Sequence, residues 1–125
     1  MSGSPARNKR KGADWEIDLM NGLREVGEDA ERLRLSGKDD EGDLVVRSAE
    51  ALNVPYLVIE AKNAKFEPGV FVGEMETEVA NFAKHRGLSA DDVDGIVIVK
   101  RRGKNWRKAF VLTTVERYFD LPDAE

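Results

Sequence analysis

The sequence predicts a mixed α/β domain in which a five-stranded mixed sheet is flanked by helices, in the order α-β-β-β-α-β-β-α. Two observations predict this class. Apolar residues recur at helical spacing in two segments, residues 13–26 and 70–86. Short runs rich in β-branched residues lie between and after these segments. A chain of 125 residues without internal repeats has the size of one domain.

The chain is expected to open with an arm that leads into an amphipathic helix. Residues 1–11 contain almost no apolar side chains, so we expect a flexible basic arm there and a single domain over residues 12–125. The apolar stripe of the helix consists of Trp15, Leu19, Leu23 and Val26. Glu16 lies at the edge of this buried face.

The second helix is expected over residues 70–86, with Gly87 as its C-terminal cap. Its apolar stripe consists of Val72, Met75, Val79, Phe82 and Ala83. Its exposed side is assigned Glu74, Glu76, Glu78 and Lys84. A short last helix, capped by Thr113 or Thr114, is expected to reach Phe119.

The strands are expected to differ in how they are buried. The first alternates, with Leu33 and Leu35 turned inward, whereas the run at 96–99 is continuously apolar, as in a strand covered on both faces. The five strands are expected at residues 31–35, 43–46, 56–62, 96–99 and 109–112.

Charge is segregated along the chain. The formal net charge is −4 (20 Lys and Arg against 24 Asp and Glu), which by itself argues against nucleic-acid binding. Residues 100–108 nevertheless contain six basic side chains, and the arm contributes Arg7, Lys9, Arg10 and Lys11. These segments predict a local positive surface on an acidic protein, or else a solvated hairpin tip and tail. Trp106 in the hairpin is predicted either to stack on a base or to cover the sheet.

Neither cysteines nor membrane-spanning runs are present. The absence of cysteine excludes disulfides and thiolate metal sites, which suits a reducing cytoplasm. No apolar run approaches the roughly 18 residues of a membrane span, and the N-terminus lacks the apolar segment of a secretory signal. A cytoplasmic protein that does not engage a membrane is therefore expected.

Two of the apolar strands carry acids where a core strand tolerates none. Asp43 opens one strand, and Glu60 lies near the end of the next, two residues before Lys62. Residues two apart in a strand point to the same face, so Glu60 and Lys62 project together and Ala61 points the other way. If the two strands pair as neighbours, Asp43 joins them in an acid–acid–lysine cluster. Buried carboxylates are usually paired or bound to a metal.

Such a cluster suits metal-assisted phosphodiester hydrolysis. Two carboxylates with the Ala61 carbonyl between them offer hard oxygen ligands for Mg²⁺, for which Mn²⁺ can substitute. Lys62 would position or activate a water molecule, and Glu16 is a candidate to support a second metal. The alternative is that Glu60 and Lys62 form a same-face surface pair of little energetic value.

The full pattern resembles the PD-(D/E)XK, or restriction-endonuclease-like, nuclease superfamily, and within it the Holliday junction resolvases of archaea and phages. A helix with Glu16, Gly42-Asp43 opening a strand, and Glu60-Ala61-Lys62 at the end of a strand carry the resemblance. It covers roughly residues 11–112. It implies a restriction-endonuclease-like core, Mg²⁺ bound by Asp43, Glu60 and the Ala61 carbonyl, and Glu16, Asp43, Glu60 and Lys62 as catalytic residues.

The resemblance also implies a substrate and a partner. Ser36-Gly37-Lys38 is similar to the serine-containing loop of the resolvases, so Ser36 and Lys38 are expected to contact phosphate. The other DNA-binding residues expected are Arg7, Lys9, Arg10, Lys11, Arg101, Arg102 and Lys104. Four-way DNA junctions and a C₂ homodimer follow from that function, in the cytoplasm of a bacterial or phage-infected cell.

Three features depart from the family pattern. Gly42 replaces the proline of the PD signature. Some relatives place a glutamine near Glu78, which puts any role of Glu78 in doubt. Asp39, Asp40 and Glu41 crowd the loop before Asp43 and are either solvated spacers or an alternative ligand.

Two other functions remain open at this point. One is a different nuclease on the same core, either restriction-type or repair, that cuts duplex, flap or single-stranded DNA. The other is a non-catalytic DNA-binding protein that keeps the fold.

Overall fold

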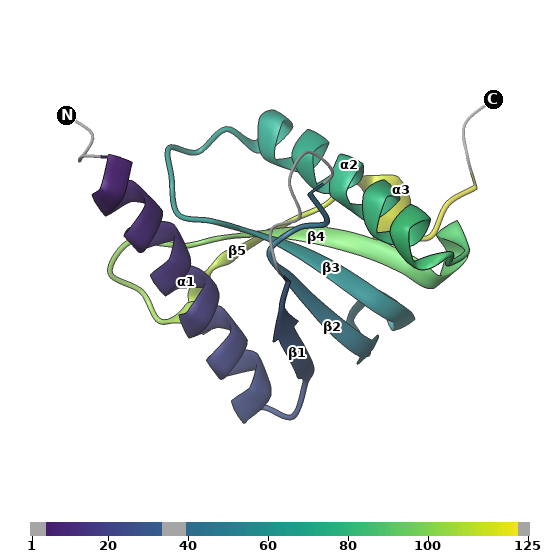
Figure 1. Ribbon diagram of the computed structural model, residues 1–125, viewed down its shortest axis with the longest axis horizontal. Helices are drawn as coiled ribbons and strands as arrows, with labels where there is room; N and C mark the ends of the chain where they lie inside the picture. Colours follow the sequence, from purple (N-terminus) through teal and green to yellow (C-terminus); the bar gives the residue numbers. More distant parts are fainter. Residues whose placement is uncertain (1–4, 34–39, 123–125) are drawn as a thin grey trace.

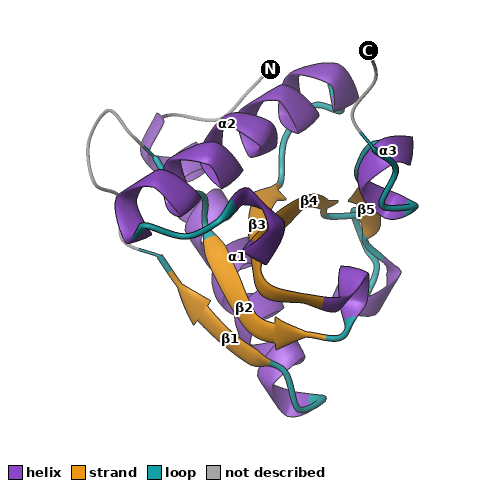
Figure 2. Cartoon of the chain, turned by 90° about the vertical axis from the view of Figure 1, so that its right-hand side faces the viewer, coloured by secondary structure: helices purple, strands orange, loops and turns teal. Residues whose placement is uncertain are grey.

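A five-stranded mixed sheet forms the centre of the protein, with α1 on one face and α2 on the other (Figures 1 and 2). The computed structural model describes residues 5–33 and 40–122. The helices are α1 (Pro5–Glu25), α2 (Pro68–Arg86) and α3 (Val115–Tyr118). The strands are β1 (Asp29–Arg32), β2 (Leu44–Ala49), β3 (Val54–Lys62), β4 (Val93–Val99) and β5 (Phe110–Leu112). Apart from three short 3₁₀ turns, this is the predicted order of elements.

The sheet runs β1-β2-β3-β4-β5, so neighbours in sequence are neighbours in space. The pairs β1–β2, β2–β3 and β4–β5 are antiparallel, and β3–β4 is parallel. A parallel pair needs a long crossover connection, and α2 supplies it by packing across one face of the sheet. The predicted mixed five-stranded sheet is confirmed.

Helix α1 begins at Pro5, where proline suits a helix start. The predicted boundary at Lys11 therefore differs from the structure, in which residues 5–11 continue the helix rather than form an extended arm. The predicted stripe is correct at its centre, since Trp15 and Leu19 are buried, whereas Val26 is exposed beyond the helix end. Trp15 also donates from Nε1 to the Ile98 carbonyl at 3.3 Å, which ties α1 to β4.

Two apolar clusters lie on the two faces of the sheet. Between the sheet and α1, the cluster includes Trp15, Leu19, Leu44, Ile59 and Ile98. Between the sheet and α2, it includes Val45, Val58, Met75, Phe82 and Val97. Because residues of β2, β3 and β4 alternate between the clusters, the central strands are covered on both faces, as the apolar run at 96–99 predicted.

Strand boundaries differ from the prediction mainly at β1. The strand covers Asp29–Arg32, and Ala30 is its buried residue. The prediction of a strand at 31–35 was shifted, because Ala30 is too small to give an apolar signal, whereas Leu33 is partly buried against the cluster under α2, as predicted. Leu35 lies outside the described residues.

Helix α2 starts with Pro68 at its first turn and ends at Gly87, which has φ 62° and ψ 33°. The predicted glycine cap is confirmed. Its buried face includes Phe71 and Glu78 besides the predicted stripe, of which Val72 is partly buried against the same cluster. None of the helices described in residues 5–33 and 40–122 combines the length and apolar character required to cross a membrane.

Candidate active site

The alternation of β3 places its last polar side chains on the α2 face. Glu60 and Lys62 contact groups of α2, whereas Ala61 packs with the cluster under α1. This confirms the prediction that Glu60 and Lys62 project together. Glu60 is only 4 % exposed, so its carboxyl group is buried at the edge of the apolar interior, near the end of the strand.

Asp43 reaches the same place from the start of β2. The antiparallel register sets Leu44 opposite Ile59, and the Asp43 N–H donates to the Ile59 carbonyl at 3.1 Å. The Ala61 N–H donates to Asp43 Oδ2 at 2.8 Å, and the Asp43 and Glu60 carboxyl groups lie in hydrogen-bond contact. The two acids separated by 16 residues of sequence therefore meet, as predicted.

Lys62 lies between two glutamates. Its Nζ is 3.7 Å from Glu60 Oε2 and 3.0 Å from Glu74 Oε2 on α2. Burial acts to lower the pKa of Lys62, but the hydrogen bond with Glu74 and the neighbouring negative charges outweigh it, so the net shift is upward. Lys62 is therefore a fixed ammonium group at neutral pH. Glu74, which sequence reasoning assigned to the exposed side of α2, is thus part of the site.

Glu78 is the residue that sequence reasoning missed. It is only 5 % exposed and lies in hydrogen-bond contact with Glu60, which corrects its assignment to the exposed side of α2. A signal was present in the sequence: Glu78 lies three residues after Met75 and four before Phe82, both in the apolar stripe. The same face of α2 brings Glu74, one turn earlier, to Lys62.

Three carboxyl groups of this cluster have strongly raised pKa values. Burial is the main cause in each case. It combines with contact to Glu60 to raise the pKa of Asp43 to about 8, and with the charge of Glu78 to raise the pKa of Glu60 to about 7. Burial together with the charges of Asp40 and Asp43 raises the pKa of Glu78 to about 8. These three carboxyl groups therefore bind protons more tightly than exposed acids do.

Glu16 lies close to this cluster but has a partner of its own. Its Oε1 accepts from Arg32 of β1 at 3.3 Å. Burial, followed by the charge of Asp43, raises the pKa of Glu16, which shows that it is electrostatically coupled to Asp43. Its role beside a second metal remains a prediction.

Of the loop acids, Glu41 is anchored to the end of α2, whereas Asp39 lies outside the described residues. Glu41 is buried, with Oε2 3.1 Å from His85 Nδ1 and Oε1 3.3 Å from an Arg86 amine, at the end of α2. It is therefore not a solvated spacer, and the possibility of an alternative ligand among the loop acids remains a prediction. Gly42 has φ +105°, and a Cβ there would lie 2.7 Å from a Val58 methyl group. Proline, with φ fixed near −65°, does not suit this conformation, which explains the departure from the PD signature.

The first turns of α1 and the loop after β4, which carry the basic segments, lie on the side of the sheet where β3 ends (Figure 1). The loop after β4 begins beside the end of β3, where the Lys100 N–H donates to the Lys62 carbonyl at 2.9 Å. Arg102 and Lys104 are exposed in this loop, while Arg101 packs over the Phe110 ring at 5.0 Å. On the first turns of α1, the exposed basic residues are Arg7, Lys9, Arg10 and Lys11. The remaining expected phosphate contacts, Ser36 and Lys38, lie outside the described residues.

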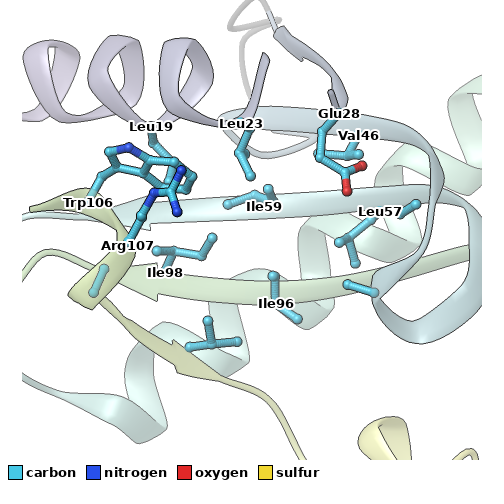
Figure 3. Close-up of a pocket in the computed structure, with 14 residues that line it drawn as sticks. Leu19, Leu23, Glu28, Val46, Leu57, Ile59, Ile96, Ile98, Trp106 and Arg107 are labelled. Carbon is cyan, nitrogen blue, oxygen red and sulfur yellow. The ribbon is translucent and has the colours of Figure 1, made fainter. Parts of the chain in front are cut away.

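An apolar pocket of about 230 Å³ lies on the opposite face of the sheet (Figure 3). Leu19 and Leu23 of α1, Ile59, Ile98 and Trp106 line it. Trp106 packs against α1, where a Cβ at Gly22 would come within 2.3 Å of the indole. Of the two roles left open for Trp106, the structure shows the covering role. The pocket is separate from the acid cluster, since Glu60 faces away from it.

The acid cluster has the donor chemistry of a hard-cation site. Asp43 and Glu60 are adjacent carboxylates, and the predicted third ligand is a backbone carbonyl, the type of oxygen that Mg²⁺ and Mn²⁺ accept. In the described part of the chain, no three Asp, Glu, His or Cys side chains are placed to hold a metal ion by themselves. The buried Glu78 Oε1, which has no hydrogen-bond partner, belongs to the side chain that contacts Glu60. The residues present therefore fit a divalent cation bound by two carboxylates and a carbonyl.

A search against protein-family models finds none that matches this chain. The site must accordingly be interpreted from its own residues.

Proposed function

We propose that this protein is a metal-dependent DNA endonuclease with a restriction-endonuclease-like core, and that it resolves four-way junctions. The observation that carries the proposal is the meeting of Asp43, Glu60 and Lys62 at one end of the sheet, next to the basic loop that follows β4. Carboxylates repel a phosphate group, so they can bind next to one only if a cation lies between them. A basic loop beside them supplies the attraction for the backbone.

The fold agrees with this proposal. Helix α1 precedes the antiparallel strands β2 and β3, which place Asp43 and Glu60. Helix α2 then crosses over to β4, which is parallel to β3. This is the arrangement that the resemblance to PD-(D/E)XK nucleases implied. The acids lie at the ends of paired central strands, so their carboxyl groups are held by the backbone register rather than by a loop.

Each residue of the site has a role in this proposal. Asp43, Glu60 and the Ala61 carbonyl would hold Mg²⁺, which when bound supplies positive charge for the phosphate and acidity for a water molecule. Lys62, held by Glu60 and Glu74, presents an ammonium group that orients the attacking water and stabilises negative charge on the phosphate. Because its ammonium group is held between Glu60 and Glu74, we assign Lys62 a positioning and electrostatic role.

The same geometry supports DNA as the substrate. Exposed basic residues on α1 and in the loop after β4 would bind phosphates on either side of the scissile bond and read backbone shape rather than sequence. Resolving a junction requires two symmetric cuts, so we propose a C₂ homodimer as the active form.

The test compares cleavage of a labelled immobile four-way junction with cleavage of a linear duplex of the same sequence. Both would be incubated with Mg²⁺ or with EDTA, using the wild type, Asp43→Asn, and Asp91→Asn as an exposed control. We expect paired nicks near the branch point that require Mg²⁺, persist in Asp91→Asn and fall at least about 100-fold in Asp43→Asn.

The alternatives give different results. Equal cleavage of junction and duplex would support the proposed nuclease activity but contradict the proposed specificity for four-way junctions. DNA binding without cleavage under Mg²⁺ or Mn²⁺ would favour a non-catalytic binding protein instead.

A further inference from the structure

Helix α2 buries a carboxylate that the PD-(D/E)XK pattern does not require. Glu78 is among the few charged side chains buried in the described residues, and its Oε1 is shielded from water without a hydrogen-bond partner. Its neighbour in space is another acid, Glu60. Two ionised carboxylates offer no donor to each other, so this contact is repulsive unless a proton or a cation is present.

The basic group of the site does not relieve this charge. Lys62 is engaged with Glu60 at 3.7 Å and with Glu74 at 3.0 Å. Among the described residues, no ion pair to Glu78 is formed. A glutamine would occupy the same position with an amide donor for Glu60, so packing does not require a carboxyl group there. The Glu78 Oε1 has no hydrogen-bond partner that would offset its desolvation.

We propose that Glu78 is a positioning residue for the cation site, which holds the Glu60 carboxyl group from the α2 side and adds negative charge behind it. In this role Glu78 acts on the Glu60 carboxyl group and need not touch the metal. Groups that support a metal ligand from behind commonly change metal affinity by 10–100-fold. The inference rests on the proposed cation site, although it does not depend on DNA cleavage.

The proposal predicts opposite effects on stability and on cation binding. Glu78→Gln keeps the shape of the side chain, removes an ionisable group and gives Glu60 an amide donor. We expect the metal-free variant to unfold at a higher temperature than the wild type, by about 2–5 °C. We expect its affinity for Mn²⁺ to fall about 10-fold or more. A residue with a purely structural role would not separate the two quantities in this way.

The experiment measures Mn²⁺ binding without DNA, from the electron paramagnetic resonance signal of the free ion, together with the thermal midpoint of the metal-free protein. Glu78→Asp tests charge apart from shape, because it keeps the carboxylate on a shorter side chain. Glu67→Gln, which is exposed just before the same helix, is the matched control. We expect Glu78→Asp to bind Mn²⁺ more tightly than Glu78→Gln, and Glu67→Gln to match the wild type.

Three outcomes would overturn the proposal. Mn²⁺ affinity of Glu78→Gln within twofold of the wild type would remove its role in binding. A lower thermal midpoint in Glu78→Gln, with Glu78→Asp no better at binding, would make Glu78 a packing residue. Absence of Mn²⁺ binding by the wild type would refute the cation site itself, whereas normal binding without junction cleavage would refute only the nuclease.

Discussion

The two faces of β3 are built from alternate residues of one strand, yet they have opposite character. On the α1 face, Ile59 and Ala61 continue an apolar cluster that ends in an open apolar pocket. On the α2 face, Val58 belongs to an equally apolar cluster, but the next inward residues are Glu60 and Lys62. At the end of β3, the apolar cluster on this face is therefore bordered by buried carboxyl groups and not by solvent.

This difference separates stability from proposed function along a single strand. The α1 face contributes burial of apolar area, which favours folding in proportion to that area. The end of the α2 face opposes folding, because Asp43, Glu60 and Glu78 are desolvated beside one another. A site of this kind is possible only because apolar clusters on both faces hold the strand in place.

The largest expected effect comes from breaking the apolar face. Leu44 has no exposed surface and lies beside Ile59 in the β2–β3 register. We expect Leu44→Ala to lower the free energy of unfolding by about 2–5 kcal/mol, through lost burial and a residual cavity. Urea denaturation at fixed pH measures this loss. The loss should be similar at pH 5 and pH 8, since no ionisable group is removed.

The buried acids on the α2 face should instead make the stability of the protein depend on pH. A folded acid with a raised pKa binds more protons than the unfolded chain between the two pKa values, so stability falls as pH rises. For Asp43, Glu60 and Glu78, this stabilisation is complete below about pH 4 and is lost as pH rises toward about 8. Each extra proton held gives a slope of about 1.4 kcal/mol per pH unit. One such proton held over most of the range from pH 5 to pH 8 corresponds to about 3 kcal/mol, so we expect the metal-free protein to lose at least about 3 kcal/mol between these pH values.

Urea denaturation across this pH range tests that expectation. Glu60→Gln should flatten the decline, and Mg²⁺ should offset it at pH 8 by replacing protons in the cluster. A stability that rises steadily from pH 5 to pH 8 without metal would contradict the assignment of raised pKa values. In that case the two faces would not differ in the way proposed here.

The features that could be predicted from the sequence follow from the strict period of strands. Alternation alone places Glu60 and Lys62 on one face and Ala61 on the other, and the pairing of sequential strands brings Asp43 to them. The element order followed from apolar periodicity, because β2, β3, β4 and α2 are long and strongly patterned. Gly87 was recognisable as a cap because few other residues adopt its left-handed conformation.

The features that could not be predicted depend on contacts between distant residues. A helical stripe has broad edges, so Glu78 could be assigned to either side of α2 until its contact with Glu60 was known. Glu41 is held by His85 and Arg86, more than 40 residues away, and no local pattern indicates this. The start of β1 was predicted two residues too far along the chain, because its buried residue is the small Ala30. The start of α1 was also predicted too late, because its first turns lack an apolar face.

A medium effect is expected at the corner where the apolar region meets the site. Gly42 has a positive φ, and a Cβ there would press on Val58 of the α2 face. We expect Gly42→Ala to cost about 1–3 kcal/mol and to displace Asp43, which follows it. Gly73→Ala is the control, because Gly73 lies inside α2 with open space around its Cα, and it should stabilise the protein by about 0.5–1 kcal/mol. Equal effects of the two substitutions would show that close approach at Gly42 is unimportant.

The smallest effect is expected where charges are paired but exposed. Arg47 on β2 bonds Asp29 and Glu31 on β1, and all three side chains are well exposed. Water screens such pairs, and ordering the side chains offsets much of the attraction. We expect Arg47→Ala to shift the urea midpoint by less than Gly73→Ala does. The shift caused by Arg47→Ala should become smaller still in 1 M salt. A large loss at Arg47 would mean that charge pairing stabilises this protein even in water, and that the acid cluster owes its energetic cost to something other than burial.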